Sequence, residues 1–465
     1  MLKTFTVDFA EFSQESLVRS NYKTTILGVE IKKHIQKAAN KFVRLKDFFY
    51  IVSGFAFKST DYEQEGLPLI RIGDVGNDFD ENNMVFLPED YREDYQRFLL
   101  KKDDIVVSLT GDGKLKSDLI LENDKYLLNQ RVGSLRAKEN TNVLFFYYLI
   151  NYYSLTKKQF YWWSNGKTQL NISPFDFLKI KIPLIPKLKQ DQIVAQIEPI
   201  EKKIKELKAQ IRPPQEVINK VFAREFGFDL EKFEKLKKIK NYYLDISLAS
   251  QNKDLRNSVA FHQESAQFVM SELKKITKSK IKHFINEPIV LGASISPSNF
   301  DEQGEHYYIS MATVKNYCLE LDDSQLISSE YAKNNLNKAV NKYDIIMTRS
   351  GVAIGKFALI EEDVNGIFAD FTMRIRLKDY NPYFAYYYFR SEYFQHLIHS
   401  NKKGLQNKNI FPSQIQELPM IDISLEKQQK IVDEIKEELD KQKEMKQKIE
   451  SERSKIDEII ENAIK

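Results

Sequence analysis

Two short segments of the chain combine lysine with glutamine and asparagine. They are GKTQLN at 166–171 and KKGLQNKN at 402–409. Lysine contacts phosphate oxygens through its charge, and the amides of Gln and Asn can pair bidentately with adenine. This chemistry fits contacts with a nucleic acid rather than catalysis. The candidate contacts in the two segments are Lys167, Thr168, Gln169, Asn171, Lys402, Lys403, Gln406, Asn407 and Lys408.

Further candidates are polar residues beside predicted strand ends, where loops held by a rigid domain can reach a ligand. Two of them lie in the Gly-flanked segment GDGKLK at 111–116. Each is also open to interpretation as a solvated surface charge, because Lys and Arg are mostly exposed in any protein. The set is Arg71, Lys114, Lys116 and Arg131 in the first half, and Lys315, Arg349, Ser350, Lys356 and Arg374 in the second.

The sequence lacks the motifs of several catalytic chemistries. NPYF at 381–384 has one proline too few for an N6-adenine methyltransferase motif, and it predicts instead a helix start with Pro382 in the first turn. GVAIGK at 351–356 has the wrong spacing for a phosphate loop, and Phe357 stands where a Ser or Thr would bind magnesium. The six histidines form no zinc motif. We therefore expect no catalytic residue, no cofactor and no metal site.

The candidate segments belong to an internal repeat with a shift of roughly 240 residues, which is appropriate to a duplicated domain. Four short matches follow one another in the same order in both halves. LIRIGDV (69–75) matches YISMATV (308–314), and DIVVSLTG (104–111) matches DIIMTRSG (344–351). NISP (171–174) matches NIFP (409–412), and QDQIV (190–194) matches QQKIV (428–432).

Each half changes its texture in the same way along the chain. Short β-type runs come first, such as LPLIRIGDV, DIVVSLT and RVGSLRA, or HYYISMATV, YDIIMTRS and TMRIRL. An aromatic stretch follows, VLFFYYLINYYSL or PYFAYYYFRSEYFQHLI, whose spacing predicts helix. Its aromatic side chains, with Trp162 and Trp163, favour core packing over base stacking.

A long charged helix closes each half, and its apolar residues recur with the heptad spacing of a coiled coil. We expect Pro213 and Pro214 to end or kink the first helix, and Gly227 to stop the helical piece that follows. The second helix is predicted over about 426–465, with polar interruptions at Gln442 and Lys446. The predicted seam is Ile193, Ile197, Ile200, Ile204, Leu207 and Ile211 in the first helix, and Ile431, Ile435, Leu439, Ile449, Ile456 and Ile460 in the second.

Composition sets wide limits. The 465 residues suggest two or three domains, and the charge of +4, from 70 basic and 66 acidic residues, does not by itself indicate a nucleic-acid partner. The single cysteine, Cys318, excludes an intramolecular disulfide. No signal peptide or membrane-spanning run is recognised, so the cytoplasm is the default location and no membrane partner is expected.

The ordered motifs resemble the specificity subunit of type I restriction–modification systems. The first half carries SGFAFK (53–58), GLPLIRIGD (66–74), DIVVS (104–108), Asn129-Gln130, GKTQ (166–169), IPL (182–184) and QDQI (190–193). The second carries SGVAIGK (350–356), LPMI (418–421) and QQKI (428–431). It departs from the pattern at VLGASISPSNF (290–300) and at DFTMRIR (370–376), which replaces the Asn-Gln pair.

The resemblance implies a mixed α/β fold with two target-recognition globules in a pseudo-two-fold arrangement, joined by two long helices in an antiparallel coiled coil. It implies a non-catalytic chain that reads a bipartite double-stranded DNA site, one half per globule. Its partners would be two methylation subunits and, for cleavage, motor-nuclease subunits. The domains would be 1–185 and 246–423 for recognition, 186–226 and 424–465 for the closing helices, and 227–245 for a connector.

Two alternatives stay open at this point. The chain could be the recognition portion of a fused or single-chain methyltransferase or nuclease system, although the missing catalytic motifs argue against that reading. It could also be an interaction scaffold whose globules bind protein. Salt separates the scaffold from a DNA reader, because phosphate contacts weaken steeply with salt.

Overall fold

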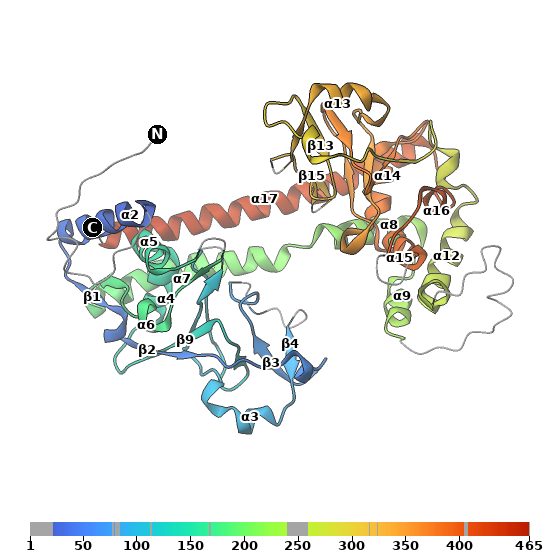
Figure 1. Cartoon of the computed structure of the whole chain (residues 1–465). Helices are drawn as coiled ribbons and strands as arrows, with labels where there is room; N and C mark the ends of the chain where they lie inside the picture. Colours follow the sequence, from blue (N-terminus) through green and yellow to red (C-terminus); the bar gives the residue numbers. More distant parts are fainter. Residues whose placement is uncertain are drawn as a thin grey trace. The chain divides into compact units, whose positions relative to one another are not determined.

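The computed structural model describes residues 22–76, 79, 84–111, 114–166, 169–239, 259–315, 317–322, 324–403 and 408–464. The chain divides into two compact units (Figure 1). Unit 1 comprises Met1–Gln210 and Lys446–Lys465, and unit 2 comprises Ile211–Met445. Both units mix sheets with helices, which confirms the predicted α/β class.

The main sheet of unit 1 has four antiparallel strands in the order β2-β9-β5-β7. Unit 1 also has a three-stranded sheet with the order β4-β3-β8. Two short strand pairs, β1-β11 and β6-β10, complete its strands. Their bounds are β1 Phe42–Arg44, β2 Phe49–Ser53, β3 Leu67–Ile70, β4 Val85–Leu87, β5 Ile105–Ser108, β6 Thr110–Gly111, β7 Ser117–Leu119, β8 Leu127–Leu128, β9 Val132–Ala137, β10 Leu170–Asn171 and β11 Lys181–Pro183.

The central strand β5 explains why the predicted β runs fold as they do. All four of its residues are buried, because one face meets the core and the other is covered as well. Such a strand reads as a continuous apolar run rather than as an alternation. The run DIVVSLT therefore corresponds to β5, and LPLIRIGDV and RVGSLRA correspond to β3 and β9.

The aromatic stretch of unit 1 forms two helices instead of one. Asn142 caps α4 by accepting a hydrogen bond from the Phe145 amide at 3.1 Å, and the backbone of Tyr153 leaves the helical region before α5 begins. Helix α2 packs on α5 at Gly28, where a Cβ atom would lie only 2.6 Å from Trp162 Nε1. The helices are α2 Tyr22–Lys37, α3 Tyr91–Asp94, α4 Val143–Tyr152, α5 Ser154–Trp163, α6 Pro174–Phe177 and α7 Lys187–Gln210.

Unit 2 repeats this topology. Its four-stranded sheet has the order β12-β20-β17-β18, its three-stranded sheet the order β16-β13-β19, and β14 pairs with β15. In each unit the middle strand of the smaller sheet, β3 or β13, has one antiparallel and one parallel neighbour. The bounds are β12 Val290–Leu291, β13 His306–Ile309, β14 Val314–Lys315, β15 Cys318–Leu319, β16 Leu326–Ile327, β17 Ile345–Thr348, β18 Phe357–Leu359, β19 Gly366–Phe368 and β20 Thr372–Ile375.

The helices of unit 2 follow the same plan. Asn381 caps α14 by accepting hydrogen bonds from the amides of Tyr383 and Phe384, with Pro382 in the first turn, which confirms the helix-start interpretation of NPYF. Ser391 separates α14 from α15. The helices are α8 Pro214–Phe226, α9 Leu230–Lys237, α11 Val259–His262, α12 Glu264–Ile276, α13 Ser329–Asn334, α14 Pro382–Arg390, α15 Glu392–Asn401, α16 Pro412–Gln416 and α17 Leu425–Ile464.

Most of the aromatic residues on these helices lie in the core. Phe145, Phe146 and Tyr153 are almost completely buried in unit 1, and Phe384, Tyr388 and Phe394 have no exposed surface in unit 2. This burial agrees with core packing as the main role of the aromatic stretches.

Helix α7 packs against the last part of α17 within unit 1. Lys203 pairs with Glu452 at 2.8 Å, whereas Ile193, ten residues earlier, lines a groove together with Ile459. The two helices therefore run antiparallel, as expected. Of the predicted seam, Ile193, Ile197, Ile204, Ile449, Ile456 and Ile460 are buried, and Ile200 and Leu207 are half-buried.

The first part of α17 packs differently, inside unit 2. Ile431 and Ile435 belong to one core cluster with Ile218 and Phe222 of α8 and with Phe384, and Leu439 packs against that cluster. Of the two polar residues predicted to interrupt the seam, Gln442 is buried and Lys446 is exposed. Burial of Gln442 is tolerated because its side chain accepts a hydrogen bond from the Arg212 amide at 2.8 Å.

The proline and glycine signals are confirmed. Helix α7 ends at Gln210, α8 begins at Pro214, and Gly227 terminates α8 with φ of 69°. The segment expected to be a connector, 227–245, contains α9, whose Phe233 is fully buried in the unit 2 core. The described part of that segment therefore belongs to unit 2.

Candidate nucleic-acid interface

In unit 2 the loop that carries the lysines is fastened to the end of β17. The Arg349 amide donates to the Phe371 carbonyl at 3.1 Å, and the Ile410 amide donates to the Arg349 carbonyl at 3.1 Å. Asn409 forms β-bridges with both Ser350 and Lys403. The sequence segments 349–351, 370–372, 402–403 and 408–410 therefore meet at one edge of the unit.

The same framework recurs in unit 1. The Leu109 amide donates to the Arg131 carbonyl at 2.9 Å, and the Ile172 amide donates to the Leu109 carbonyl at 2.9 Å. Asn171 pairs with Thr110 in β10-β6 and exchanges two 2.7 Å backbone hydrogen bonds with Asn165. Each of these contacts has its counterpart in unit 2 at a shift of about 240 residues, so the repeat extends to individual hydrogen bonds.

A third pair of equivalent contacts holds one lysine of each unit next to this edge. The amide of Ser108 donates to the Lys116 carbonyl, and that of Thr348 donates to the Lys356 carbonyl, both at 3.0 Å. The side chains of Lys116 and Lys356 are exposed. A cation is thus fixed by its backbone at the same place in both units.

An aspartate braces the opposite end of the central strand. The Asp344 carboxylate accepts hydrogen bonds from Arg376 Nε at 2.8 Å and Arg376 Nη2 at 2.7 Å. Asp104 accepts one from Arg136 Nε at 3.2 Å, and its burial raises the pKa of its carboxyl group although Arg136 and the Lys101 amide oppose this effect. Bonding to Asp344 raises the pKa of Arg376. These braces are structural supports for the edge that the loops occupy.

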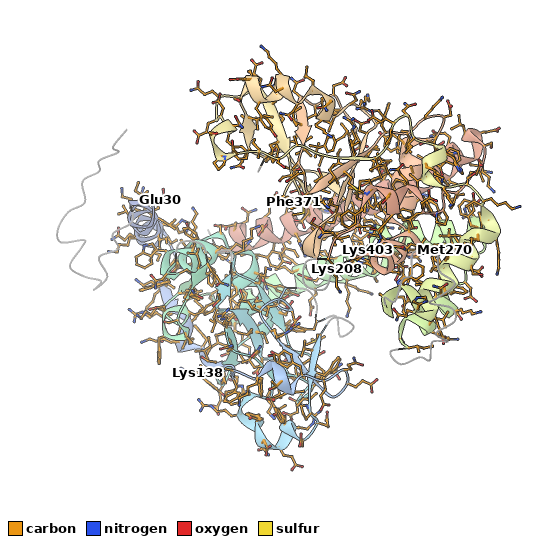
Figure 2. All side chains as sticks on the ribbon, turned by 45° about the vertical axis from the view of Figure 1, so that its right-hand side comes forward. Glu30, Lys138, Lys208, Met270, Phe371 and Lys403 are labelled. Carbon is orange, nitrogen blue, oxygen red and sulfur yellow. The ribbon has the colours of Figure 1, made fainter. Side chains whose placement is uncertain are left out.

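The unit 2 loop concentrates positive charge. Burial and the nearby charge of Lys408 lower the pKa of Lys402, which shows that the two ammonium groups repel each other. Lys403 and Lys408 are exposed (Figure 2 shows Lys403), and Lys356 directly precedes β18, which pairs with β17. An anion bound at this loop would relieve the repulsion, which is the behaviour expected of a phosphate contact.

Several predicted residues share this edge in unit 1. Arg131 is exposed with φ of 69°, Gln169 and Asn171 are exposed on the loop, and Lys114 and Lys116 are exposed beside it. Lys167 and Thr168 in unit 1, and Gln406 and Asn407 in unit 2, lie outside the described residues.

Three other predicted residues are engaged in protein contacts. The Arg374 side chain is 4% exposed, where it pairs with Glu287 and donates to the carbonyls of Asn337 and Ala339. Arg71 is paired with Asp74 at 3.6 Å. Lys315 lies 3.7 Å from Glu320 on the β14-β15 hairpin. The prediction for Arg374 is corrected, because a guanidinium buried in this way cannot reach a ligand without unfolding its surroundings.

Sequence reasoning missed two aromatic residues at this edge. Phe371 is 49% exposed and Phe411 is 41% exposed, although most large aromatics of unit 2 are buried. The carbonyl of Phe371 accepts the hydrogen bond from the Arg349 amide, and Phe411 directly follows Ile410, whose amide donates to the Arg349 carbonyl. The departure of DFTMRIR from the family pattern marked the position of Phe371, but it gave no sign that the ring is exposed.

Among the described residues, no group of three or more His, Cys, Asp or Glu side chains could hold a metal ion. Within the same residues, no helix has the length and the apolar character needed to cross a membrane.

Comparisons with known proteins agree on one family. Residues 38–213 and 274–452 each match the type I restriction modification DNA specificity domain. A type I restriction enzyme MjaVIII specificity subunit from Methanocaldococcus jannaschii is 32% identical over 161 residues, 33% of this chain and 37% of the relative. The EcoAI specificity subunit from Escherichia coli is 25% identical over 211 residues, 43% of this chain and 34% of the relative. The chain thus matches about a third of the length of each relative.

Solved structures give a weaker likeness. The S subunit of a type I restriction–modification system from M. genitalium has a TM-score of 0.43 at 13% identity, covering 92% of this chain and 97% of that one. The HsdS subunit from Thermoanaerobacter tengcongensis has a TM-score of 0.33 at 12% identity, covering 91% and 96%. Scores this low do not support residue-by-residue superposition.

Proposed function

The chain belongs to the type I restriction–modification DNA specificity family, and on that premise we propose that each unit reads one half of a bipartite double-stranded DNA site. The observation that carries the proposal is the shared edge. In both units a loop with cationic and amide side chains is bonded to the end of the central strand through equivalent backbone contacts. A rigid strand end with a polar loop is the usual way to present side chains to base edges.

The proposed division of labour follows from the residue types. Lys116, Lys356, Lys403 and Lys408 would contact phosphates, which position the protein without reading sequence. Gln169 and Asn171 would contact bases, together with Lys167, Thr168, Gln406 and Asn407 on the same loops. Arg131 and Arg349 would also contact bases, because backbone hydrogen bonds fix each of them at the same edge of its unit.

The proposed role is recognition without catalysis, and it agrees with the name of the matching family and with those of the relatives. Methyl transfer would come from methylation subunits, two per chain, docked on the helices α7 and α17. Cleavage would come from motor-nuclease subunits. The chain would act in the cytoplasm, where its DNA lies. The proposed division is 1–185 and 246–423 for recognition, 186–226 and 424–465 for the closing helices, and 227–245 between them.

An exchange experiment tests independent reading by the two units. Residues 246–420 would be replaced by the equivalent domain of a relative with another specificity, and N6-methyladenine would be mapped in cells that express the complete system. We expect one half of the methylated site to change and the other half to persist. A change in both halves would show that the units are not separate readers.

A salt titration tests whether DNA is the ligand at all. The affinity of the purified complex for a duplex with the mapped site should fall steeply and log-linearly with salt, because bound cations release counterions from DNA. An affinity that is independent of salt would favour an interaction scaffold that binds protein.

A further inference from the structure

Unit 2 presents one arginine in a fixed orientation at the proposed DNA edge. Arg349 Nε donates to the Asp370 carbonyl at 3.1 Å, and the Arg349 guanidinium carbon lies 5.8 Å from the centre of the Phe411 ring. Its backbone is held on both sides by Phe371 and Ile410. The guanidinium is therefore positioned by its backbone, by one hydrogen bond and by one aromatic face.

The far end of the same side chain has no partner among the described residues. No hydrogen bond or ion pair joins either Arg349 Nη atom to any residue that the structure describes. Arginine presents its two Nη donors in a fixed planar fork, which matches two acceptors on one edge of a ligand. The O6 and N7 atoms of guanine in the major groove are such a pair, and this is the commonest specific contact of arginine with DNA.

The turn beside Arg349 is equally rigid. Thr372 donates to the Ala369 carbonyl through both its amide, at 2.9 Å, and its hydroxyl, at 2.7 Å, and Ser294 donates to the Asp370 carboxylate at 2.9 Å. Phe371 sits at the exposed corner of this turn (Figure 2). An exposed aromatic ring on a turn that is held by hydrogen bonds is poorly solvated by water. Such a ring suits contact with an apolar group such as a thymine methyl.

Unit 1 has no such frame. The residue equivalent to Arg349 is Leu109, which is 6% exposed, and the residue equivalent to Phe371 is Arg131, which is exposed. Phe411 is replaced by Ser173, which caps α6. The arginine of unit 1 thus stands at the turn rather than at the strand end, and the two units present different chemistry to their half-sites.

We propose that Arg349 reads a guanine in the half-site of unit 2, held for bidentate pairing by the Asp370 carbonyl and the Phe411 ring, with Phe371 in contact with the neighbouring base. This inference rests on the proposed function and names one base of its target. The same fork would also fit a phosphate, but a phosphate contact does not depend on the base sequence, and this difference separates the two.

The test is selection from a fully randomised duplex library. The bait is the complex isolated through the full-length chain from cells that express the complete system. The wild-type complex should enrich a bipartite motif with an invariant guanine in one half. R349A should lose selection at that position alone, by about 5- to 150-fold, the factor that corresponds to about 1–3 kcal/mol per bidentate pair.

Three further variants sharpen the result. R349K keeps the charge but not the fork, so it should fail to restore the guanine preference. F371A should relax the choice at the adjacent position. R131A should alter the other half of the motif only, which identifies the half that belongs to unit 2.

The outcomes separate the inference from the function beneath it. If the wild-type complex enriches a bipartite motif and R349A still selects the same guanine, the inference is wrong. A uniform loss of affinity across sequences with a shallower salt slope would make Arg349 a phosphate contact and also overturn it. If the folded wild-type complex enriches no bipartite motif, the proposed function itself fails.

Discussion

Removal of the Asp344 carboxylate should weaken unit 2 more than removal of the equivalent Asp104 weakens unit 1. Asp344 is 1% exposed, holds Arg376 with two hydrogen bonds and accepts a third from the Asn341 amide at 2.7 Å. D344A leaves a guanidinium that is only 24% exposed without its main partner. Breaking such a buried pair costs about 3–5 kcal/mol, and we expect the lower end because Glu287 remains 3.5 Å from Arg376.

D104A should cost only about 1–2 kcal/mol, at the level of lost hydrogen bonds to a buried acceptor. Arg136 donates to Asp104 once, at 3.2 Å, and keeps a 2.6 Å hydrogen bond to the Leu99 carbonyl after the change. The two costs should be read separately, because two units need not unfold in one step. Hydrogen exchange of the amides in β17 and β5, measured on the full chain, gives a local free energy of opening for each unit.

The isosteric variants provide the control, and Asp104 also gives a dependence on pH. Asn retains an acceptor for the backbone amide, so D344N should cost less than D344A. Because burial raises the folded-state pKa of Asp104, the wild-type carboxyl is favourable when protonated and loses stability as the pH rises through that pKa. The cost of D104N should therefore shrink as the pH rises. An equal cost of D344A and D104A, or the reverse order, would refute the idea that the second arginine contact carries the difference.

Three further predictions concern unit 2. Alanine at Lys402, Lys403 and Lys408 should lower DNA affinity and flatten its log–log salt slope by about one per lost phosphate contact. Salt titrations of DNA binding measure the slope, and K333A on α13 serves as the exposed control. An unchanged slope would place the three lysines away from DNA. Desolvation and the charges of Lys237 and His399 lower the pKa of His396 to about 4, although the charge of Glu234 opposes them. The unfolded state therefore binds the extra proton, and the free energy of unfolding should fall by up to about 3 kcal/mol as the pH drops from 6.5 to 4. Denaturant unfolding should show this slope in the wild type and not in H396F. Y388F should cost about 1–1.5 kcal/mol of stability, because the Tyr388 hydroxyl donates to the Pro419 carbonyl at 2.9 Å. Y393F should be neutral or stabilising, because the equally buried Tyr393 hydroxyl has no partner among the described residues. A larger cost for Y393F than for Y388F would contradict this explanation.

Much of the fold followed from local patterns. Apolar runs such as DIVVS predicted central strands, and Pro213, Pro214 and Gly227 marked helix ends, because these signals act through the backbone within a few residues. The heptad pattern found long helices, but it did not divide α17 between two partners. Ile431 and Ile456 look alike in sequence, and only the tertiary neighbours decide that Ile431 lies in the core of unit 2.

The candidate site was harder to predict for a similar reason. Arg349 and Arg374 both belong to strand ends in the sequence, yet the first is positioned at an open edge and the second is buried against Glu287. Exposure depends on which strand lies next to which, and sequence spacing does not encode it. Phe371 was missed because an aromatic residue is usually taken as core, and its exposure depends on one pinned turn.

The division of α17 has a consequence for the synthesis of the protein. Unit 1 includes residues 446–465. The end of α17 packs on α7 and forms hydrogen bonds with Asn40 and Ser154 of the same unit. Residues 446–465 are synthesised after all the residues of unit 2. At about 5–20 residues per second, the gap between residues 210 and 446 takes roughly 10–50 s.

During that interval α7 has an apolar face, with Ile193, Ile197 and Ile204, and its permanent partner does not yet exist. Unit 2 has no such delay, since it is continuous in the chain. The second recognition unit should therefore complete its core before the first, against the usual N-to-C order of folding. A released chain that ends before residue 446 would keep every residue of the second unit and lack part of the first.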